Sequence, residues 1–227
     1  INNNIKEAIY KKGHLLSSVS NARLFDEFCK IFLNGMAEKN FNKLVSFGLN
    51  KYLVSTNLNG CEFSNQLIIE ALRNTDNRIK NNQSVTPGFL IAALLWPQLI
   101  KKSLKGNEIN LKKFFRSMDS ILRNQQKITA IPRKFHTYIK DIWVLQLKLH
   151  SRIGRQPYKT LKHPRFRAAY DFLLVREKAA AKTKNLGFWW TEFQKNNEDL
   201  KKKLINDMKK NNLEESSKIF GFSKELR

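Results

Sequence analysis

Arginine and lysine side chains gather between residues 152 and 176, where aromatic residues are interleaved with them. Two of the arginines flank Phe166, and Tyr170 follows four residues later. A guanidinium group can contact a phosphate through two hydrogen bonds and can stack on an unpaired base, which suits single-stranded RNA. The chemistry indicated here is therefore binding rather than bond-making. The basic candidates in this stretch are Arg152, Arg155, Lys159, Lys162, Arg165, Arg167 and Arg176.

The aromatic residues have two interpretations. Phe166 shares an apolar helical stripe with Tyr170, which favours a place in the core. Phe188, Trp189, Trp190 and Phe193 can form a platform on which bases stack, but such clusters more often anchor a C-terminal helix in the core. We favour the core plug for Trp189 and Trp190 and keep the stacking platform as the alternative.

Residues that catalyse bond-making are not grouped in this sequence. Nucleotidyl transfer needs close-spaced carboxylates that hold Mg²⁺, whereas the acidic residues here are scattered and mostly sit beside lysines. No Gly-rich phosphate loop occurs, and none of the four histidines is followed by Asp. We therefore predict no catalytic residue and no metal site in this chain.

The charge is the unusual bulk property. The 227 residues contain 42 Lys+Arg against 19 Asp+Glu, a formal net charge of +23. Ionised side chains are too costly to bury unpaired, so the surface must be positive, and nucleic acid is the leading partner, with an anionic membrane second. The joint abundance of Lys and Asn is also typical of an AT-biased genome, which explains part of the excess but not its clustering.

Cysteine usage and hydropathy bear on the compartment. Cys29 lies on an apolar helical stripe and Cys61 is far from it, so we expect reduced thiols and a cytoplasmic protein. The longest apolar run, residues 88–100, is too short to cross a bilayer and predicts a buried core helix with no membrane span. The sequence starts at Ile1 rather than Met, from which we expect that further residues precede it.

The elements that must position the basic residues are helices. Phe25, Phe28 and Phe32 recur at helical spacing and predict a helix over about 22–33, while no run shows the alternation of a strand. Thr86 is a good N-cap before Pro87, and Pro97 predicts a kink or break in the helix that follows. Pro164 is expected to start another helix, with His163 near its N-cap.

We therefore predict an all-α fold, a multi-helix bundle with a basic helical C-terminal extension. The composition changes near Ser151, where the extension begins. Leu200, Leu204 and Met208 form a thin apolar stripe in its last part, which predicts an exposed helix that frays toward Arg227.

Segments spread along nearly the whole chain resemble the bacterial poly(A) polymerases, which are class II nucleotidyltransferases. The longest of them, HPRFRAAYDFLLVR, is highly specific when it occurs in order with the others. The segments are ARLFDE (22–27), LRNTDNRI (72–79), IPR (131–133), DIW (141–143) with LQL (145–147), HPRFRAAYDFLLVR (163–176) and WWTEFQ (189–194).

The resemblance implies residues 1–50 as part of a neck, 51–150 as a helical body and 151–227 as a basic C-terminal RNA-binding region. It implies a parent enzyme that adds AMP from ATP to RNA 3′ ends, in mRNA polyadenylation that promotes decay, with Mg²⁺ held in an N-terminal catalytic domain that has no counterpart here. Arg133 and Lys134 then join the RNA-binding candidates. Arg23 either helps shape the nucleotide pocket or is a surface arginine.

Two alternatives stay open at this point. CCA-adding tRNA nucleotidyltransferases keep a related neck and body, and base choice is made in the part that this sequence lacks. The second alternative is a helical module whose basic face docks an acidic protein partner or a membrane surface. The tail departs from the family's Arg-rich pattern because its lysines are mixed with Asp and Glu, so a grip by an extended basic tail is in question.

Overall fold

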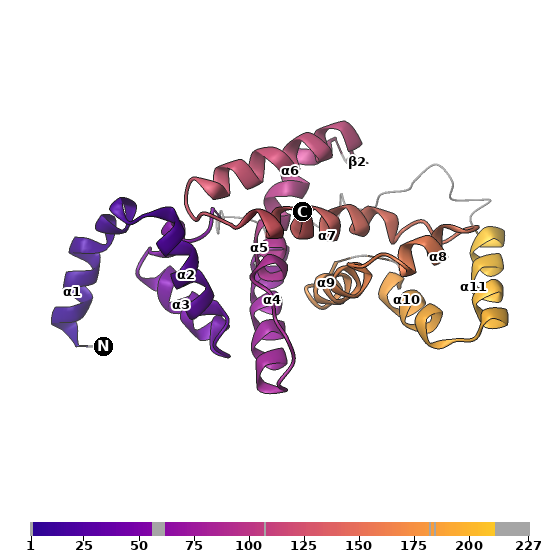
Figure 1. Cartoon of the computed structure of the whole chain (residues 1–227), viewed down its shortest axis with the longest axis horizontal. Coiled ribbons are helices and arrows are strands. Elements are labelled where there is room, and N and C mark those ends of the chain that lie inside the picture. The colour runs from indigo at the N-terminus through magenta and orange to yellow at the C-terminus, as the bar shows by residue number, and fades with distance from the viewer. Residues whose placement is uncertain (1, 56–61, 107, 182, 184, 212–227) are drawn as a thin grey trace.

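The computed structural model describes residues 2–55, 62–106, 108–181, 183 and 185–211, and within them the fold is all-α (Figure 1). In this described part of the chain, helices follow one another, and one two-stranded hairpin lies between two of them. The elements are α1 (Asn3–Lys12), η1 (Gly13–Ser18), α2 (Asn21–Phe32), α3 (Ala37–Ser46), η2 (Asn50–Tyr52), α4 (Glu62–Lys80), α5 (Pro87–Ser103), β1 (Leu104–Lys105), β2 (Glu108–Ile109), α6 (Leu111–Gln126), α7 (Arg133–Lys148), α8 (Gln156–Leu161), α9 (Phe166–Lys178), α10 (Leu186–Lys195) and α11 (Glu198–Asn211).

Helix α5 is the centre of the body. It is apolar on all sides and packs against α4, α6, α7 and α9, as a helix without a polar face must. The hydroxyl of Thr86 accepts a hydrogen bond from Phe89 N at 3.3 Å and Pro87 occupies the first turn, which confirms the predicted cap. Of the predicted kink or break at Pro97, the break is excluded because the helix continues to Ser103, and the kink stays a prediction.

Aromatic residues tie the N-terminal helices to the body. Phe25, Phe28 and Phe32 of α2 are buried, and the rings of Phe28 and Phe32 lie 4.8 Å apart. Phe41 of α3 continues the row, so the helix predicted over 22–33 is confirmed and its apolar stripe is core. In contrast, α1 buries none of its residues.

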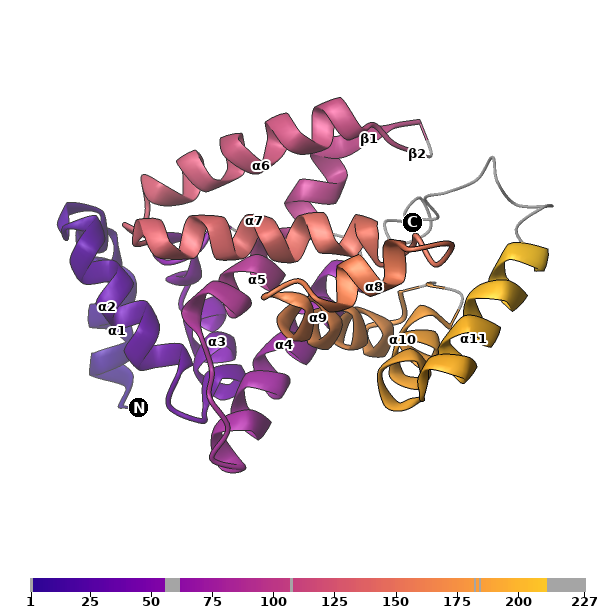
Figure 2. The ribbon, with the colours of Figure 1, turned by 45° about the vertical axis from the view of Figure 1, so that its right-hand side comes forward.

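Helix α9 belongs to two cores at once. Phe172, Val175 and Ala179, at its C-terminal end, pack into the body core with α5. Phe166 and Leu173 pack into a second cluster with α10 and α11, together with Leu145 and Leu149 of the α7 end, Ala169, Tyr170, Leu186, Trp189, Trp190, Phe193 and Ile205. Figure 2 shows α4 and α9 next to each other below α7, with α1–α3 at one end of the molecule and α10 and α11 at the other.

The tryptophans of α10 are a core plug, as we favoured. Trp190 is fully buried and its Nε1 donates a hydrogen bond to the carbonyl oxygen of Leu149 at 2.9 Å. Trp189 is 7% exposed, and its ring stacks on Phe193. A stacking platform built on these residues is therefore excluded, and Phe188 is the one member of the group that faces water, at 69% exposure.

The start of α9 differs from the prediction. The helix begins at Phe166, while Pro164 lies in the preceding turn. His163 folds this turn, because its Nδ1 accepts a hydrogen bond from Arg165 N at 3.1 Å and its carbonyl oxygen accepts one from Phe166 N at 2.8 Å. The hydrogen bond from Arg165 N to the His163 side chain competes with helix formation. The helix therefore begins at Phe166, two residues later than the predicted start at Pro164.

Other predictions fall partly outside the described residues. Cys29 is a half-buried free thiol beside the body core, and burial raises its pKa, whereas Cys61 lies outside the described residues. Helix α11 buries Ile205, which the predicted stripe omitted, while Leu200 is exposed; residues 212–227, where fraying was expected, are not described. Among the described helices, none has the length and apolarity needed to cross a membrane.

The plug role of Trp190 is testable by truncation. We expect Trp190→Ala to lower the free energy of unfolding by about 3–5 kcal/mol, because it removes a buried ring and a buried hydrogen bond. Phe188→Ala, the exposed neighbour, should change it by less than about 0.5 kcal/mol. Urea denaturation followed by circular dichroism measures both, and equal effects of the two changes would contradict the assignment.

Candidate nucleic-acid interface

A groove runs between α4 and α9, and we call it the α4–α9 groove. It consists of two adjoining hollows that share Asn74, Arg78, Arg167 and Asp171. The first, of about 210 Å³, ends against Tyr138 and Arg165, and the second, of about 280 Å³, continues toward Asn81 and Lys178. The first hollow is also lined by Thr75, Ser84, Val85, Thr86, Phe89, Pro164 and Ala168.

The α4 wall of the groove is a stripe of amide and guanidinium groups. Asn74, Asn77, Arg78 and Asn81 occupy positions i, i+3, i+4 and i+7, so they share one face of the helix and its end. The other face of α4 carries Leu67, Ile68, Ala71 and Leu72, all buried in the body core. Burial of the apolar face therefore turns the polar stripe toward α9.

The α9 wall follows from the same periodicity. Arg167, Asp171, Leu174 and Lys178 recur every three or four residues and line the groove, while Phe172 and Val175 point into the body core. The two walls come from segments about ninety residues apart, as the ion pair between Arg78 and Asp171 shows. Packing of both helices on α5 brings these walls together.

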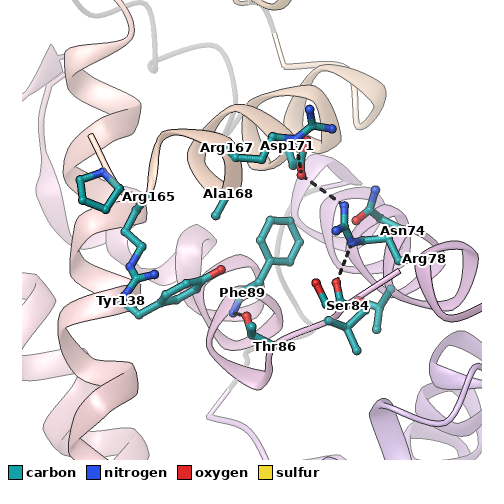
Figure 3. A pocket seen from close by; sticks show the side chains of 13 residues that line it. Asn74, Arg78, Ser84, Thr86, Phe89, Tyr138, Arg165, Arg167, Ala168 and Asp171 are labelled. Atoms are coloured by element: carbon teal, nitrogen blue, oxygen red, sulfur yellow. Dashed lines mark hydrogen bonds and ion pairs between the residues drawn. The ribbon is translucent and has the colours of Figure 1, made fainter. Parts of the chain in front are cut away.

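One carboxylate organises the charges of the groove. Asp171 accepts from Nη1 of Arg78 at 3.3 Å and lies 3.0 Å from Nε of Arg167 (Figure 3). Arg78 also donates from Nε to the carbonyl oxygen of Ser84 at 3.1 Å, which fixes its guanidinium. The Arg167 side chain is 74% exposed, and an exposed pair of this kind is weak, so Arg167 can turn to an incoming phosphate at little cost.

The end of the first hollow next to α7 combines an aromatic ring with a cation. The guanidinium carbon of Arg165 lies 4.9 Å from the ring centroid of Tyr138, which comes from α7. Figure 3 shows Arg165 and Tyr138 on one side of the hollow, Asn74 and Arg78 on the other, and Phe89 between them. A cation on an aromatic face keeps its charge available at the rim while it is held in place.

The predicted RNA-binding residues do not form one patch. Arg165 and Arg167 meet in the groove, and both are exposed. Arg133 and Lys134 are exposed in the first turn of α7. A third group surrounds α8 beyond the other end of α7, where Arg155, Lys159 and Lys162 are exposed, while Arg152 is half-buried with its guanidinium carbon 5.8 Å from the Trp189 ring centroid.

The prediction that Arg176 binds RNA is wrong. Its side chain is fully buried, its Nη1 donates to Oε1 of Gln146 at 3.0 Å, and its guanidinium carbon lies 4.8 Å from the Trp96 ring centroid. Gln146 in turn donates to the carbonyl oxygen of Ala169 at 2.9 Å. Arg176 therefore joins α9 to α5 and α7, and the helical period placed it on the core side.

This buried cation affects a histidine nearby. His150 follows the end of α7 and its Nε2 is shielded from solvent. Burial, together with the positive charges of Arg176 and Arg152, lowers the pKa of His150 from 6.5 to about 3. His150 is therefore neutral in the folded protein at neutral pH.

Two further predictions concern the nucleotide and the metal. Arg23 is exposed in the first turn of α2, where its backbone N–H donates to the Ser20 hydroxyl, and its place in a nucleotide pocket stays a prediction. Among the described residues no group of three or more His, Cys, Asp or Glu side chains could hold a metal ion.

Several groove residues were missed by sequence reasoning. Asn74, Arg78, Tyr138 and Asp171 line the groove, yet none was a candidate. A signal for the first two was present, because LRNTDNRI places Asn74, Asn77 and Arg78 on one polar helix face. Tyr138 and Asp171 carried no signal of their own, since only the packing of α7 and α9 brings them to the groove.

The fold and the groove together define a class, an all-helical domain with an arginine-lined surface suited to nucleic acid. Two family models match the chain. Residues 1–56 match a model described as the probable RNA- and SrmB-binding site of polymerase A, and residues 107–219 match the arginine-rich C-terminus of polymerase A. Together they cover about three quarters of the chain.

Curated relatives agree with these models. The chain is 33% identical over 213 residues to poly(A) polymerase I of Salmonella typhimurium, which covers 89% of this chain and 46% of the relative. It is 34% identical to poly(A) polymerase I of Escherichia coli O157:H7 over the same shares, and 32% identical to that of Haemophilus influenzae, covering 90% and 48%. The chain belongs to the bacterial poly(A) polymerase family and spans about half the length of these relatives.

A substitution distinguishes the buried from the exposed arginine of α9. We expect Arg176→Ala to lower the free energy of unfolding by about 3 kcal/mol, because it leaves the Gln146 oxygen without this donor and opens space beside Trp96. Arg167→Ala should change it by less than about 1 kcal/mol. Thermal and urea denaturation measure both values. A larger loss from Arg167→Ala than from Arg176→Ala would contradict the assigned roles.

The lowered pKa of His150 predicts a pH dependence of stability. Between pH 6.5 and about 3 the unfolded chain binds a proton on this residue and the folded chain does not, so stability is lost as the pH falls through this range. The loss attributable to His150 approaches about 1.4 kcal/mol per pH unit. Urea denaturation at pH 6.5, 5.5 and 4.5 should show a shallower decline for His150→Gln than for the wild type, and parallel declines would contradict the prediction.

Proposed function

We propose that this chain is the RNA-holding part of a polynucleotide adenylyltransferase that adds AMP from ATP to RNA 3′ ends. The α4–α9 groove carries the proposal, because it places exposed Arg165 and Arg167 beside a polar helix stripe in a chain of this family. In this role the chain binds and positions the RNA strand. The catalytic domain that the parent enzyme would supply, with its Mg²⁺ and ATP, is a further partner of the chain in the proposal.

The exposed basic residues outside the groove suit a strand that extends beyond it. Arg133 and Lys134 lie in the first turn of α7, the helix that also supplies Tyr138 to the groove. Arg155, Lys159 and Lys162 lie around α8, which is joined to α9 by a short turn. Contacts to phosphate fix the path of a strand without reading its sequence, so we assign these residues to strand affinity alone.

The proposal also covers where the parent enzyme acts and what it adds, and it has one competitor. The parent enzyme would act on mRNA in the cytoplasm, where 3′ polyadenylation promotes decay. The curated relatives are named poly(A) polymerase I, which supports poly(A) addition over CCA addition. A basic module that docks an acidic protein or a membrane surface has no specific observation in its favour and serves as a competing outcome of the test.

The proposal predicts salt-sensitive binding of single-stranded RNA through the exposed arginines. The triple variant Arg155→Ala, Arg165→Ala, Arg167→Ala should bind an RNA oligonucleotide more weakly than the wild type. The slope of log affinity against log salt should fall by about 0.7 for each phosphate that the variant no longer neutralises. Fluorescence anisotropy with a labelled oligonucleotide at several salt concentrations measures both quantities.

A matched control removes the same charge from another face. Lys112, Arg116 and Arg123 are exposed on α6, which lies on the other side of α7 from α9 (Figure 1). Changing these three to Ala should weaken binding less than the test variant does. Equal weakening would mean that net charge alone holds the RNA, and preference of the wild type for anionic vesicles over RNA would favour the docking alternative.

A further inference from the structure

We propose that the first hollow of the α4–α9 groove receives the base of one unpaired adenine nucleotide of the strand, and that Asn74 selects this base. The selection would come from the side-chain oxygen of Asn74, which accepts a hydrogen bond from the 6-amino group of adenine. This inference rests on the proposed function and adds a base preference to it.

The observation behind the inference is an unused acceptor. Oδ1 of Asn74 is buried from solvent and has no hydrogen-bond donor within reach among the described residues. Nearly all buried polar groups in folded proteins have a partner. Asn74 lines the first hollow, so a rotation of its amide would bring this acceptor to a donor from outside the chain. A ligand that brings an N–H group to this place would satisfy it.

The chemistry of the bases decides which ligand fits. Adenine presents an amino group beside a ring nitrogen, and an asparagine amide pairs with that edge through two hydrogen bonds. Guanine and uracil present a carbonyl oxygen at the equivalent place and donate only from the ring N–H beside it, so each would have to enter the hollow in a different orientation to reach the Asn74 oxygen. Cytosine has an amino group but a smaller ring to stack, so we expect adenine first and cytosine second.

The walls of the hollow suit a flat ring. Phe89, Tyr138 and Ala168 supply apolar surface, and Figure 3 shows Tyr138 on the Arg165 side of the hollow and Phe89 between it and Arg78. Stacking of bases on aromatic rings holds unpaired strands without a duplex. The volume of about 210 Å³ lies below the roughly 300–1,000 Å³ of sites for drug-sized ligands, which fits one base rather than a base pair.

The charges place the phosphates at the rim and the base inside. Asp171 puts a carboxylate on the inner wall, only 13% exposed, which repels a phosphate that enters the groove. Arg165 and Arg167 are exposed at the edge and can each take a phosphate on either side of the base. The base, which has no charge, therefore occupies the place beside Asp171 and Asn74.

The test first compares two ligands that differ only in the 6-amino group, and then changes the protein. Fluorescence anisotropy compares a labelled oligo(A) with an oligomer of the same length made of purine riboside, which is adenosine without its 6-amino group. We expect the wild type to bind oligo(A) roughly three- to tenfold more tightly, the range that one net hydrogen bond gives. Asn74→Ala should bind both oligomers equally, while Asn42→Ala, an exposed change on α3, should keep the preference.

The outcomes separate this inference from the proposed function. Equal affinity of the wild type for the two oligomers, with weaker binding of both by the Arg155, Arg165 and Arg167 triple variant, overturns the adenine site and leaves the RNA-holding function standing. Absence of RNA binding overturns both. Displacement of oligo(A) by an equal concentration of AMP would overturn the assignment to a strand. The comparison of ligands on the wild type keeps the test valid if Asn74→Ala fails to fold.

Discussion

The structure depends on one constraint, which is that α5 has no polar face and must be covered on every side. Helices α4, α6, α7 and α9 supply the cover. Two of them, α4 and α9, are distant in sequence and become neighbours only because each buries its apolar face on the same body core. Their polar faces are then left next to each other, and the groove is the result of this arrangement.

A carboxylate in a basic groove has a clear physical role. Asp171 holds Arg78 through a pair that is mostly shielded from water, and it holds Arg167 through one that is open to water. The two guanidinium groups would otherwise repel each other across a narrow space. The acid therefore makes a dense cationic wall compatible with folding, while the exposed arginine keeps its freedom to meet a phosphate.

The sequence predicted the helices and much of the core because local periodicity determines them. The α2 stripe, the Thr86 cap and the plug of Trp190 were all confirmed. Arg176 was misassigned because its charge was weighed above its place on the core side of α9. Asn74 and Tyr138 could not be joined from the sequence, since their proximity depends on the packing of α4 and α7 around α5 and on the turn that His163 forms.

Helix α9 packs into two cores and also forms one wall of the groove, so its sides have three different surroundings. Inserting or deleting a single residue within it would rotate everything beyond that point by about 100°. An insertion before Asp171 would move its carboxylate to the position that Phe172 occupies in the body core, so that core and groove would fail together. Sequence change in this helix is consequently confined to substitution at fixed length.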